Sequence, residues 1–186
     1  MRLFPAVLAL VIGLLAGCAP GRDLAPLPEV TPSAYRLGVG DQVRIITFGE
    51  DQLTGTFRVN DSGLIDLPLL GAVKASGLTS SRLGSEIATE LKQRKLFRDP
   101  SVSVEINEYR PIFVLGEVKT PGEYPYRPGM TVLTAVTVAG GFTYRAIEDY
   151  ASVVRTSESD KAVEGLVNRQ SFLMPGDVLT IYERRF

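Results

Sequence analysis

One stretch decides the fold of the second half of the chain: residues 128–141, PGMTVLTAVTVAGG. Thr131 is a typical helix N-cap, because its hydroxyl can accept a hydrogen bond from a free backbone N–H of the first turn. The apolar side chains that follow recur on one helical face: Val132, Ala135, Val136 and Ala139. The pair Gly140-Gly141 then ends the helix, because glycine adopts the left-handed backbone conformation without strain. The stretch therefore predicts one short amphipathic helix.

The segments on either side of this helix have the composition of strands and turns. Residues 112–115 form a continuous apolar run, which predicts a strand buried on both faces. In residues 120–123 a proline and a glycine occupy the positions that a type II turn favours. Two later runs, 153–154 and 178–181, predict further strands, with a turn over residues 174–177 between them.

The first half of the chain is also rich in strand signals. Residues 41–48 are β-branched and bounded by glycines, which predicts a strand. Alternation at 57–59, a turn at 61–63 and an apolar return at 64–67 together predict a β-hairpin. A later strand is predicted by three alternating apolar residues directed inward: Val102, Val104 and Ile106.

A helix is predicted between these strands. It begins after Thr79 or Ser80 as the N-cap and ends near Lys95. Its buried face is marked by three apolar residues spaced four apart: Leu83, Ile87 and Leu91. Glu90 and Arg94 are one turn apart on the opposite face, where they can form an ion pair.

A short internal similarity links the two halves. Residues 37–45 and 173–181 share the pattern Leu-x-x-Gly-Asp-x-apolar-x-Ile. We interpret Asp41 and Asp177 as turn formers, whose carboxylates accept hydrogen bonds from nearby backbone N–H groups. The pattern fits an α+β fold with two small β-rich domains, each with one short helix.

Composition limits the chemistry that the chain can perform. Twenty Lys and Arg against 21 Asp and Glu give a net charge of −1, so nucleic acid is not expected as a partner. There is no histidine, and the remaining residues offer no spacing typical of a zinc or haem site. Gly38–Asp41 is not a dinucleotide-binding loop, because Val43 occupies the position of the third glycine. We therefore expect no catalytic residue, cofactor or metal, and a protein that is not an enzyme.

The N-terminus has the features of a secretory signal peptide. Arg2 supplies a positive charge, and residues 3–15 form an apolar run that is too short to span a bilayer stably. The sequence Leu-Ala-Gly-Cys that ends at Cys18 resembles a bacterial lipobox, which implies that the only cysteine is lipidated and becomes the mature N-terminus. The alternative is that Cys18 is a buried thiol in a core helix, but the many prolines that follow it argue against a helix there. Ala19 after the cysteine favours the outer membrane by the same resemblance.

Two larger segments resemble known domains. Residues 115–124 followed by 128–141 resemble a soluble-ligand-binding β-grasp (SLBB) repeat. Residues 35–43, 59–68 and 71–79 resemble the polysaccharide export domain. The order lipobox, export domain and SLBB repeat resembles the polysaccharide export outer-membrane lipoproteins of the Wza type.

This resemblance divides the chain into four parts and implies a function. The parts are a signal peptide (1–18), a proline-rich tether (19–34), an export domain (35–109) and a β-grasp-like SLBB domain (110–186). Members of the family form periplasmic, lipid-anchored homo-oligomeric rings through which capsular or extracellular polysaccharide leaves the cell. Their usual partner is an inner-membrane polysaccharide co-polymerase. Larger members add a C-terminal pore helix, whereas this sequence stops after a predicted strand, so we expect another route across the outer membrane.

Tyrosines are the candidate polysaccharide contacts, because a phenol offers both a stacking face and a hydroxyl. We single out Tyr124, Tyr126 and Tyr144, with Tyr109 and Tyr150 as further candidates. The competing interpretation is that these side chains pack half-buried within β-rich domains.

Two other functions stay open at this point. A monomeric adaptor lipoprotein could bind a glycan or a partner and serve a separate outer-membrane channel, which the missing pore helix favours. A glycan-processing enzyme would need paired carboxylates in one cleft. Asp41 and Glu50 are the nearest approach to such a pair.

Overall fold

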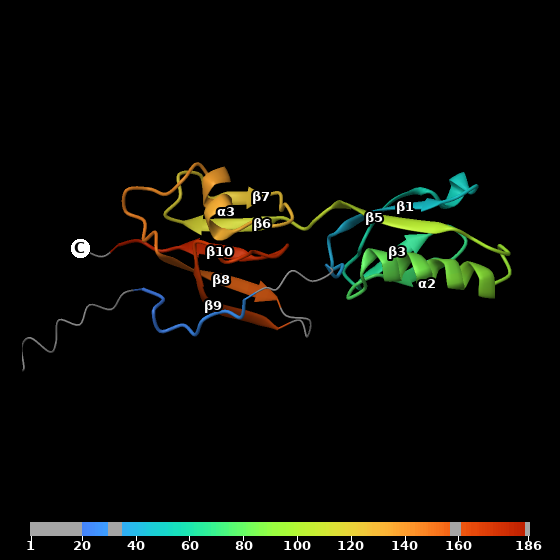
Figure 1. Ribbon diagram of the computed structural model, residues 1–186, viewed down its shortest axis with the longest axis horizontal. Coiled ribbons are helices and arrows are strands. Elements are labelled where there is room, and N and C mark those ends of the chain that lie inside the picture. Colours follow the sequence, from blue (N-terminus) through green and yellow to red (C-terminus); the bar gives the residue numbers. More distant parts are fainter. Residues whose placement is uncertain (1–19, 30–34, 157–160, 185–186) are drawn as a thin grey trace, which may run out of the picture.

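The computed structural model describes residues 20–29, 35–156 and 161–184, which form two domains side by side along the long axis (Figure 1). Each domain has its own hydrophobic core. Each also has one α-helix, α2 in the N-terminal domain and α3 in the C-terminal domain. The predicted α+β fold of two small β-rich domains is therefore confirmed.

Two small antiparallel sheets and one helix build the N-terminal domain. One sheet has the strand order β2-β1-β5, and β3 and β4 form a separate two-stranded sheet. The elements are β1 (Gln42–Thr47), η2 (Asp51–Leu53), β2 (Gly55–Arg58), β3 (Leu64–Leu67), β4 (Gly71–Lys74), α2 (Ser80–Gln93) and β5 (Val102–Glu108).

Helix α2 has the boundaries and the buried face that its sequence predicts. The Thr79 hydroxyl accepts a hydrogen bond from the backbone N–H of Arg82 at 3.2 Å, which caps the first turn. The apolar side chains of the helix are buried: Leu83, Ile87 and Leu91. Glu90 and Arg94 form the expected ion pair at 3.1 Å.

The predicted hairpin over residues 57–67 is wrong in its pairing, although its turn is in the expected place. β2 pairs with β1, and β3 pairs with β4. Asn60 begins the turn between β2 and β3. Its Oδ1 accepts hydrogen bonds from the N–H groups of Ser62 and Leu64 at 3.1 and 3.0 Å. Val59 N–H still donates to Asp41 O at 2.9 Å, so the chain follows β1 until this turn begins.

One five-stranded sheet with a helix on one face builds the C-terminal domain. Its strand order is β7-β6-β10-β8-β9, with β10 parallel to β6 and the other pairs antiparallel. Buried side chains of the helix and the inner sheet face form the core. The elements are β6 (Ile112–Gly116), β7 (Gly122–Tyr124), α3 (Val132–Val138), β8 (Tyr150–Thr156), β9 (Ala162–Asn168) and β10 (Val178–Ile181).

Helix α3 forms as residues 128–141 predict. The Thr131 hydroxyl accepts a hydrogen bond from Thr134 N–H at 3.3 Å, and the Thr134 hydroxyl accepts one from Thr131 N–H at 2.7 Å. These two bonds complete a capping box. Gly140 and Gly141 have φ angles of 85° and 91°, so the helix ends where only glycine adopts the backbone conformation easily.

Strand β6 differs from its prediction, because it is buried on one face only. Ile112 and Val114 are fully buried against the helix side, whereas Phe113 and Leu115 are 38% and 46% exposed. A continuous apolar run therefore does not mean that both faces are covered in this sheet.

Two further features of the C-terminal domain were not predicted correctly. Residues 120–123 do not form a type II turn, because Gly122 starts β7 and has no positive φ. At the end of β6 the left-handed backbone conformation occurs at Gly116 instead, with φ of 83°. Strand β9 is absent from the predictions, because Glu164 and Gly165 interrupt its apolar pattern.

Residues 20–29 pack on the C-terminal domain, although they precede the N-terminal domain in the sequence (Figure 1). Leu27 N–H donates to Leu166 O at 2.8 Å, and Leu166 N–H donates to Ala25 O at 2.9 Å. Gly165 leaves the necessary space, because a Cβ there would lie 3.0 Å from the Ala25 O and Leu27 Cα atoms. This part of the proline-rich segment, expected to be a tether, is thus docked along the edge strand β9.

The predicted signal peptide and Cys18 lie outside the described residues. Within the ranges that the structure describes, no helix is long and apolar enough to span a bilayer.

Candidate functional site at the domain junction

The shared Leu-x-x-Gly-Asp pattern forms the same buried loop in both domains. In the N-terminal domain the Asp41 carboxylate accepts hydrogen bonds from Gly38 N–H at 2.8 Å and from the Tyr35 hydroxyl at 2.7 Å. In the C-terminal domain the Asp177 carboxylate accepts one from Met174 N–H at 2.7 Å. Both aspartates are fully buried, so their interpretation as turn formers is confirmed.

Each buried aspartate also has an arginine partner, which the sequence did not reveal. Arg155 on β8 binds Asp177 through two hydrogen bonds, Nε to Oδ1 at 2.9 Å and an Nη to Oδ2 at 2.6 Å. Arg110, in the connector between the domains, donates its backbone N–H to Asp41 at 2.9 Å. Its guanidinium Nε lies 3.5 Å from the same carboxylate, a distance that suits an ion pair better than a hydrogen bond.

The Arg110 side chain lies between the two loops. A Cβ at Gly38 would come within 2.6 Å of its guanidinium, and one at Gly176 would come within 3.8 Å. On the C-terminal side, Gly176 N–H donates to Pro111 O at 3.0 Å. The connector is therefore bonded to both loops, and Gly38 leaves the room that the arginine occupies, whereas a Cβ at Gly176 would make only ordinary van der Waals contact with it.

A row of tyrosines crosses the same junction. The rings of Tyr35 and Tyr109 meet edge to face with centroids 5.1 Å apart, and those of Tyr109 and Tyr126 with centroids 5.5 Å apart. Burial is the main cause that raises the pKa of all three hydroxyls. At Tyr35 the hydrogen bond to Asp41 and the charge of that carboxylate raise the pKa further.

The three tyrosines predicted as polysaccharide contacts have different surroundings. Tyr126 belongs to the row at the junction. Tyr124 on β7 packs against the core, and its hydroxyl donates to Thr120 O at 2.5 Å. Tyr144, in the loop after α3, is 86% exposed. A role for these side chains in polysaccharide contact stays a prediction.

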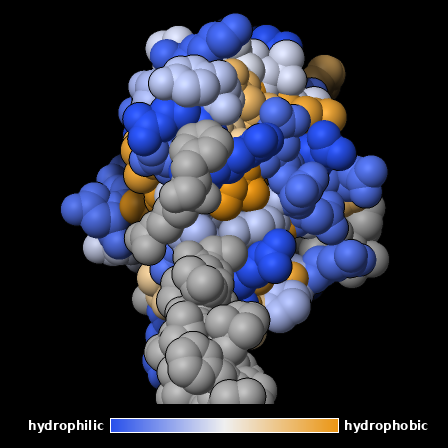
Figure 2. All heavy atoms as spheres, turned by 90° about the vertical axis from the view of Figure 1, so that its left-hand side faces the viewer, coloured by the Kyte–Doolittle hydropathy of each residue, from blue (hydrophilic) through white to orange (hydrophobic). Residues whose placement is uncertain are grey.

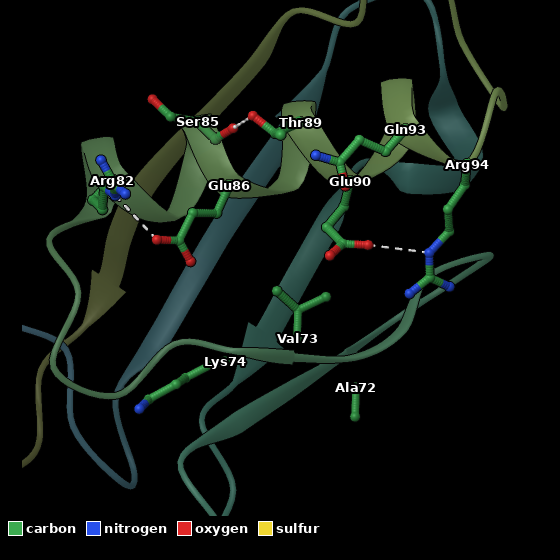
Figure 3. A pocket seen from close by; sticks show the side chains of 10 residues that line it. All are labelled: Ala72, Val73, Lys74, Arg82, Ser85, Glu86, Thr89, Glu90, Gln93 and Arg94. Atoms are coloured by element: carbon green, nitrogen blue, oxygen red, sulfur yellow. Dashed lines mark hydrogen bonds and ion pairs between the residues drawn. The ribbon is translucent and has the colours of Figure 1, made fainter.

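A polar groove of about 440 Å³ lies between α2 and β4 in the N-terminal domain (Figure 3). Two glutamates of the helix point toward it, and each is held by an arginine: Glu86 by Arg82 at 3.0 Å and Glu90 by Arg94 at 3.1 Å. These contacts pair both carboxylates with cations, so neither glutamate is an unpaired carboxylate of the kind that acid–base chemistry uses.

The structure separates the one carboxylate pair that the sequence suggested. Asp41 precedes β1 and is buried at the junction, whereas Glu50 follows the other end of that strand. A strand of this length holds them roughly 20 Å apart. Among the described residues, no group of three or more acidic or cysteine side chains is placed to hold a metal ion.

Comparisons with known proteins match both domains. The family model "Polysaccharide biosynthesis/export protein" matches residues 29–107, and the SLBB domain model matches residues 111–167. Among curated proteins, the exopolysaccharide production protein ExoF of Rhizobium meliloti is 44% identical over 142 residues, which cover 69% of this chain and 32% of ExoF.

Two further relatives carry export or transport in their names. The EPS I polysaccharide export outer membrane protein EpsA of Ralstonia nicotianae is 30% identical over 117 residues, 61% of this chain and 30% of EpsA. The polysialic acid transport protein KpsD of Escherichia coli is 26% identical over 144 residues, 76% of this chain and 25% of KpsD. The chain spans about a third or less of the length of these relatives. The connector residue Arg110 lies between the two matched segments.

Proposed function

Because the chain belongs to the polysaccharide biosynthesis/export family, we propose that it is a component of the outer-membrane apparatus that exports capsular or extracellular polysaccharide. The observation that carries this proposal is the order of an export domain and an SLBB domain, joined directly at Arg110. The relatives whose names state export or transport support the same conclusion.

Within this apparatus we propose a non-enzymatic, ring-forming conduit. A ring subunit must present the same surfaces in every copy, and the bonded junction supports this requirement, because it fixes one domain against the other. The nearly balanced charge of the chain also suits a conduit, since a polymer must pass without being held.

The proposal places the protein at the periplasmic face of the outer membrane, anchored by lipid on Cys18. Its partners would be the polysaccharide itself, further copies of the chain and an inner-membrane polysaccharide co-polymerase. More than one acyl chain makes such an anchor effectively stable. A Cys18→Ser variant is expected to remain as an uncleaved or mislocalised precursor in membrane fractionation, and normal recovery in the outer membrane would contradict the anchor.

A monomeric adaptor that serves a separate outer-membrane channel is the second candidate. It is favoured by the match of residues 111–167 to the SLBB domain, a domain named for binding soluble ligands. In this case the C-terminal domain would hold a glycan or a partner protein without forming a conduit.

The native mass of the full-length protein, extracted gently in detergent and imaged by negative stain, distinguishes the two candidates. A closed ring supports the conduit. A monomer that stays monomeric when the co-polymerase is present supports the adaptor. Deletion of the gene is expected to stop surface polysaccharide without stopping growth, and unchanged surface polymer in a strain without a paralogue would contradict both.

A further inference from the structure

Two exposed apolar surfaces on the C-terminal domain indicate how copies of the chain could contact one another. Seen from the end of this domain, hydrophobic residues are exposed between hydrophilic ones (Figure 2). Single exposed apolar residues are common on protein surfaces, but groups of them bordered by charges mark interaction sites. The inference rests on the proposed ring, because it names the surfaces that would join its subunits.

The first surface, the open sheet face, lies on the side of the five-stranded sheet opposite α3, at the end where β10 begins. Residues 20–22 cover the other end of this side, at Tyr150 and Tyr182. Phe113 and Leu115 project from β6 on this side, because their neighbours in the strand are buried against the helix. The strand register places Val178 beside Phe113 and Val154 beside Val178, and both valines are half-buried. An apolar row thus crosses three adjacent strands.

The second surface, the outer helix face, lies on the other side of the same domain. Leu133 and Val138 of α3 are 45% and 49% exposed, and Phe172 beside the start of the helix is 43% exposed. Phe172 is held there by a β-bridge to Thr131. The buried side of α3 packs on the sheet, so its exposed residues point away from the sheet.

The charges that border the two surfaces are opposite in sign. The open sheet face has exposed glutamates at both edges, because Glu123 pairs with Phe113 and Glu164 pairs with Val154 in the strand register. On the outer helix face Leu133 N–H donates to the backbone oxygen of Arg169, so this exposed arginine lies beside the helix. Opposite charges at the borders favour contact between the two surfaces over contact of either surface with a copy of itself.

We propose that copies of this chain associate head to tail, with the outer helix face of one copy packed on the open sheet face of the next. Because the two surfaces are different, each copy keeps one of each surface available for a further neighbour. Such a heterologous contact repeats and closes into a ring, whereas a contact of one surface with itself stops at a dimer.

Cysteine cross-linking of the full-length protein in membranes tests this contact. Variants carry Leu115→Cys, Leu133→Cys or both, and a second set carries Phe113→Cys and Val138→Cys, so that two alignments of the surfaces are sampled. After mild oxidation, the chain with both substitutions is expected to give a ladder of dimers, trimers and larger species. Each single variant and the unmodified chain should give at least tenfold less cross-linked product.

A matched control combines Leu133→Cys with Leu69→Cys, because Leu69 is 57% exposed but belongs to the N-terminal domain. This pair is expected to give no ladder of cross-linked species. A dimer formed by Leu133→Cys alone would indicate self-contact of the helix face and overturn the proposal. If neither double variant gives a ladder while the unmodified protein has the mass of a ring, the proposed contact is wrong but the ring stands. If the unmodified protein is a monomer in every preparation, the ring itself fails.

Discussion

Replacing Arg110 by methionine is expected to destabilise the N-terminal domain and loosen the junction. The substitution keeps the backbone N–H that donates to Asp41, and it keeps most of the side-chain volume between the loops. It removes the only arginine guanidinium beside the Asp41 carboxylate among the described residues. Asp41 is fully buried, so its charge would depend on hydrogen bonds alone.

The magnitude follows from burial. Removing one partner of a buried ion pair costs about 3–5 kcal/mol. The Arg110 side chain is 29% exposed, and Asp41 keeps hydrogen bonds from Gly38 and Tyr35, so we expect a loss of about 2 kcal/mol. Arg58→Met is the matched control. Its pair with Glu108 spans 3.6 Å between side chains that are more than half exposed, and such pairs contribute less than about 1 kcal/mol.

Urea unfolding of the detergent-purified protein, followed by tyrosine fluorescence and circular dichroism, measures both variants. Tyrosine serves as the probe because the chain has no tryptophan. The double variant with Asp41→Asn should lose less stability than the sum of the two single variants, since removing the buried charge removes the need for the cation. Additive losses, or a loss for Arg110→Met no larger than for Arg58→Met, would refute this account of the junction.

Three other predictions follow from single positions. Gly116→Ala should lower the free energy of unfolding by about 3 kcal/mol in thermal unfolding, because φ is 83° and the new Cβ would lie 2.0 Å from Ile181 O. Gly122→Ala is the control and should change stability little, because no atom lies near the new Cβ. The Tyr35 pKa is raised in the folded state, so its contribution to stability is present at neutral pH and is lost as pH rises above about 10; the difference between the absorbance titrations of the unmodified chain and a Tyr35→Phe variant should show the Tyr35 hydroxyl ionising above that pH. Gly165→Leu should displace residues 25–27 from β9 and speed proteolysis within residues 20–29, whereas Val163→Asp, on the same strand but exposed, should not.

Local features were predictable from the sequence where short-range chemistry determines them. Thr79 and Thr131 cap their helices as expected, because an N-cap bond spans only three residues. The pairing of β2 with β1 was not predictable in this way, because an apolar alternation does not specify the partner strand. The exposure of Phe113 was not predictable either, because the number of covered sheet faces depends on which distant segments pack against the sheet.

In the candidate site, too, the short-range features were predictable from the sequence and the long-range contacts were not. The repeated Gly-Asp pattern was visible in the sequence, and its role as a turn was predicted correctly. The arginine partners were missed, because Arg155 and Arg110 reach their aspartates from positions 22 and 69 residues away. The one available signal was that two buried aspartates in apolar surroundings would each need a cation or several donors.

The duplicated loop gives a physical reason for the short connector between the domains. In each loop the aspartate carboxylate binds its own backbone and one arginine, so the loop is rigid before the other domain is considered. The connector then bonds to both loops within two residues, through Arg110 to Asp41 and through Pro111 O to Gly176. Two rigid loops bonded to adjacent residues leave few backbone rotations free, so we expect the two domains to keep the same relative arrangement in every copy of the chain.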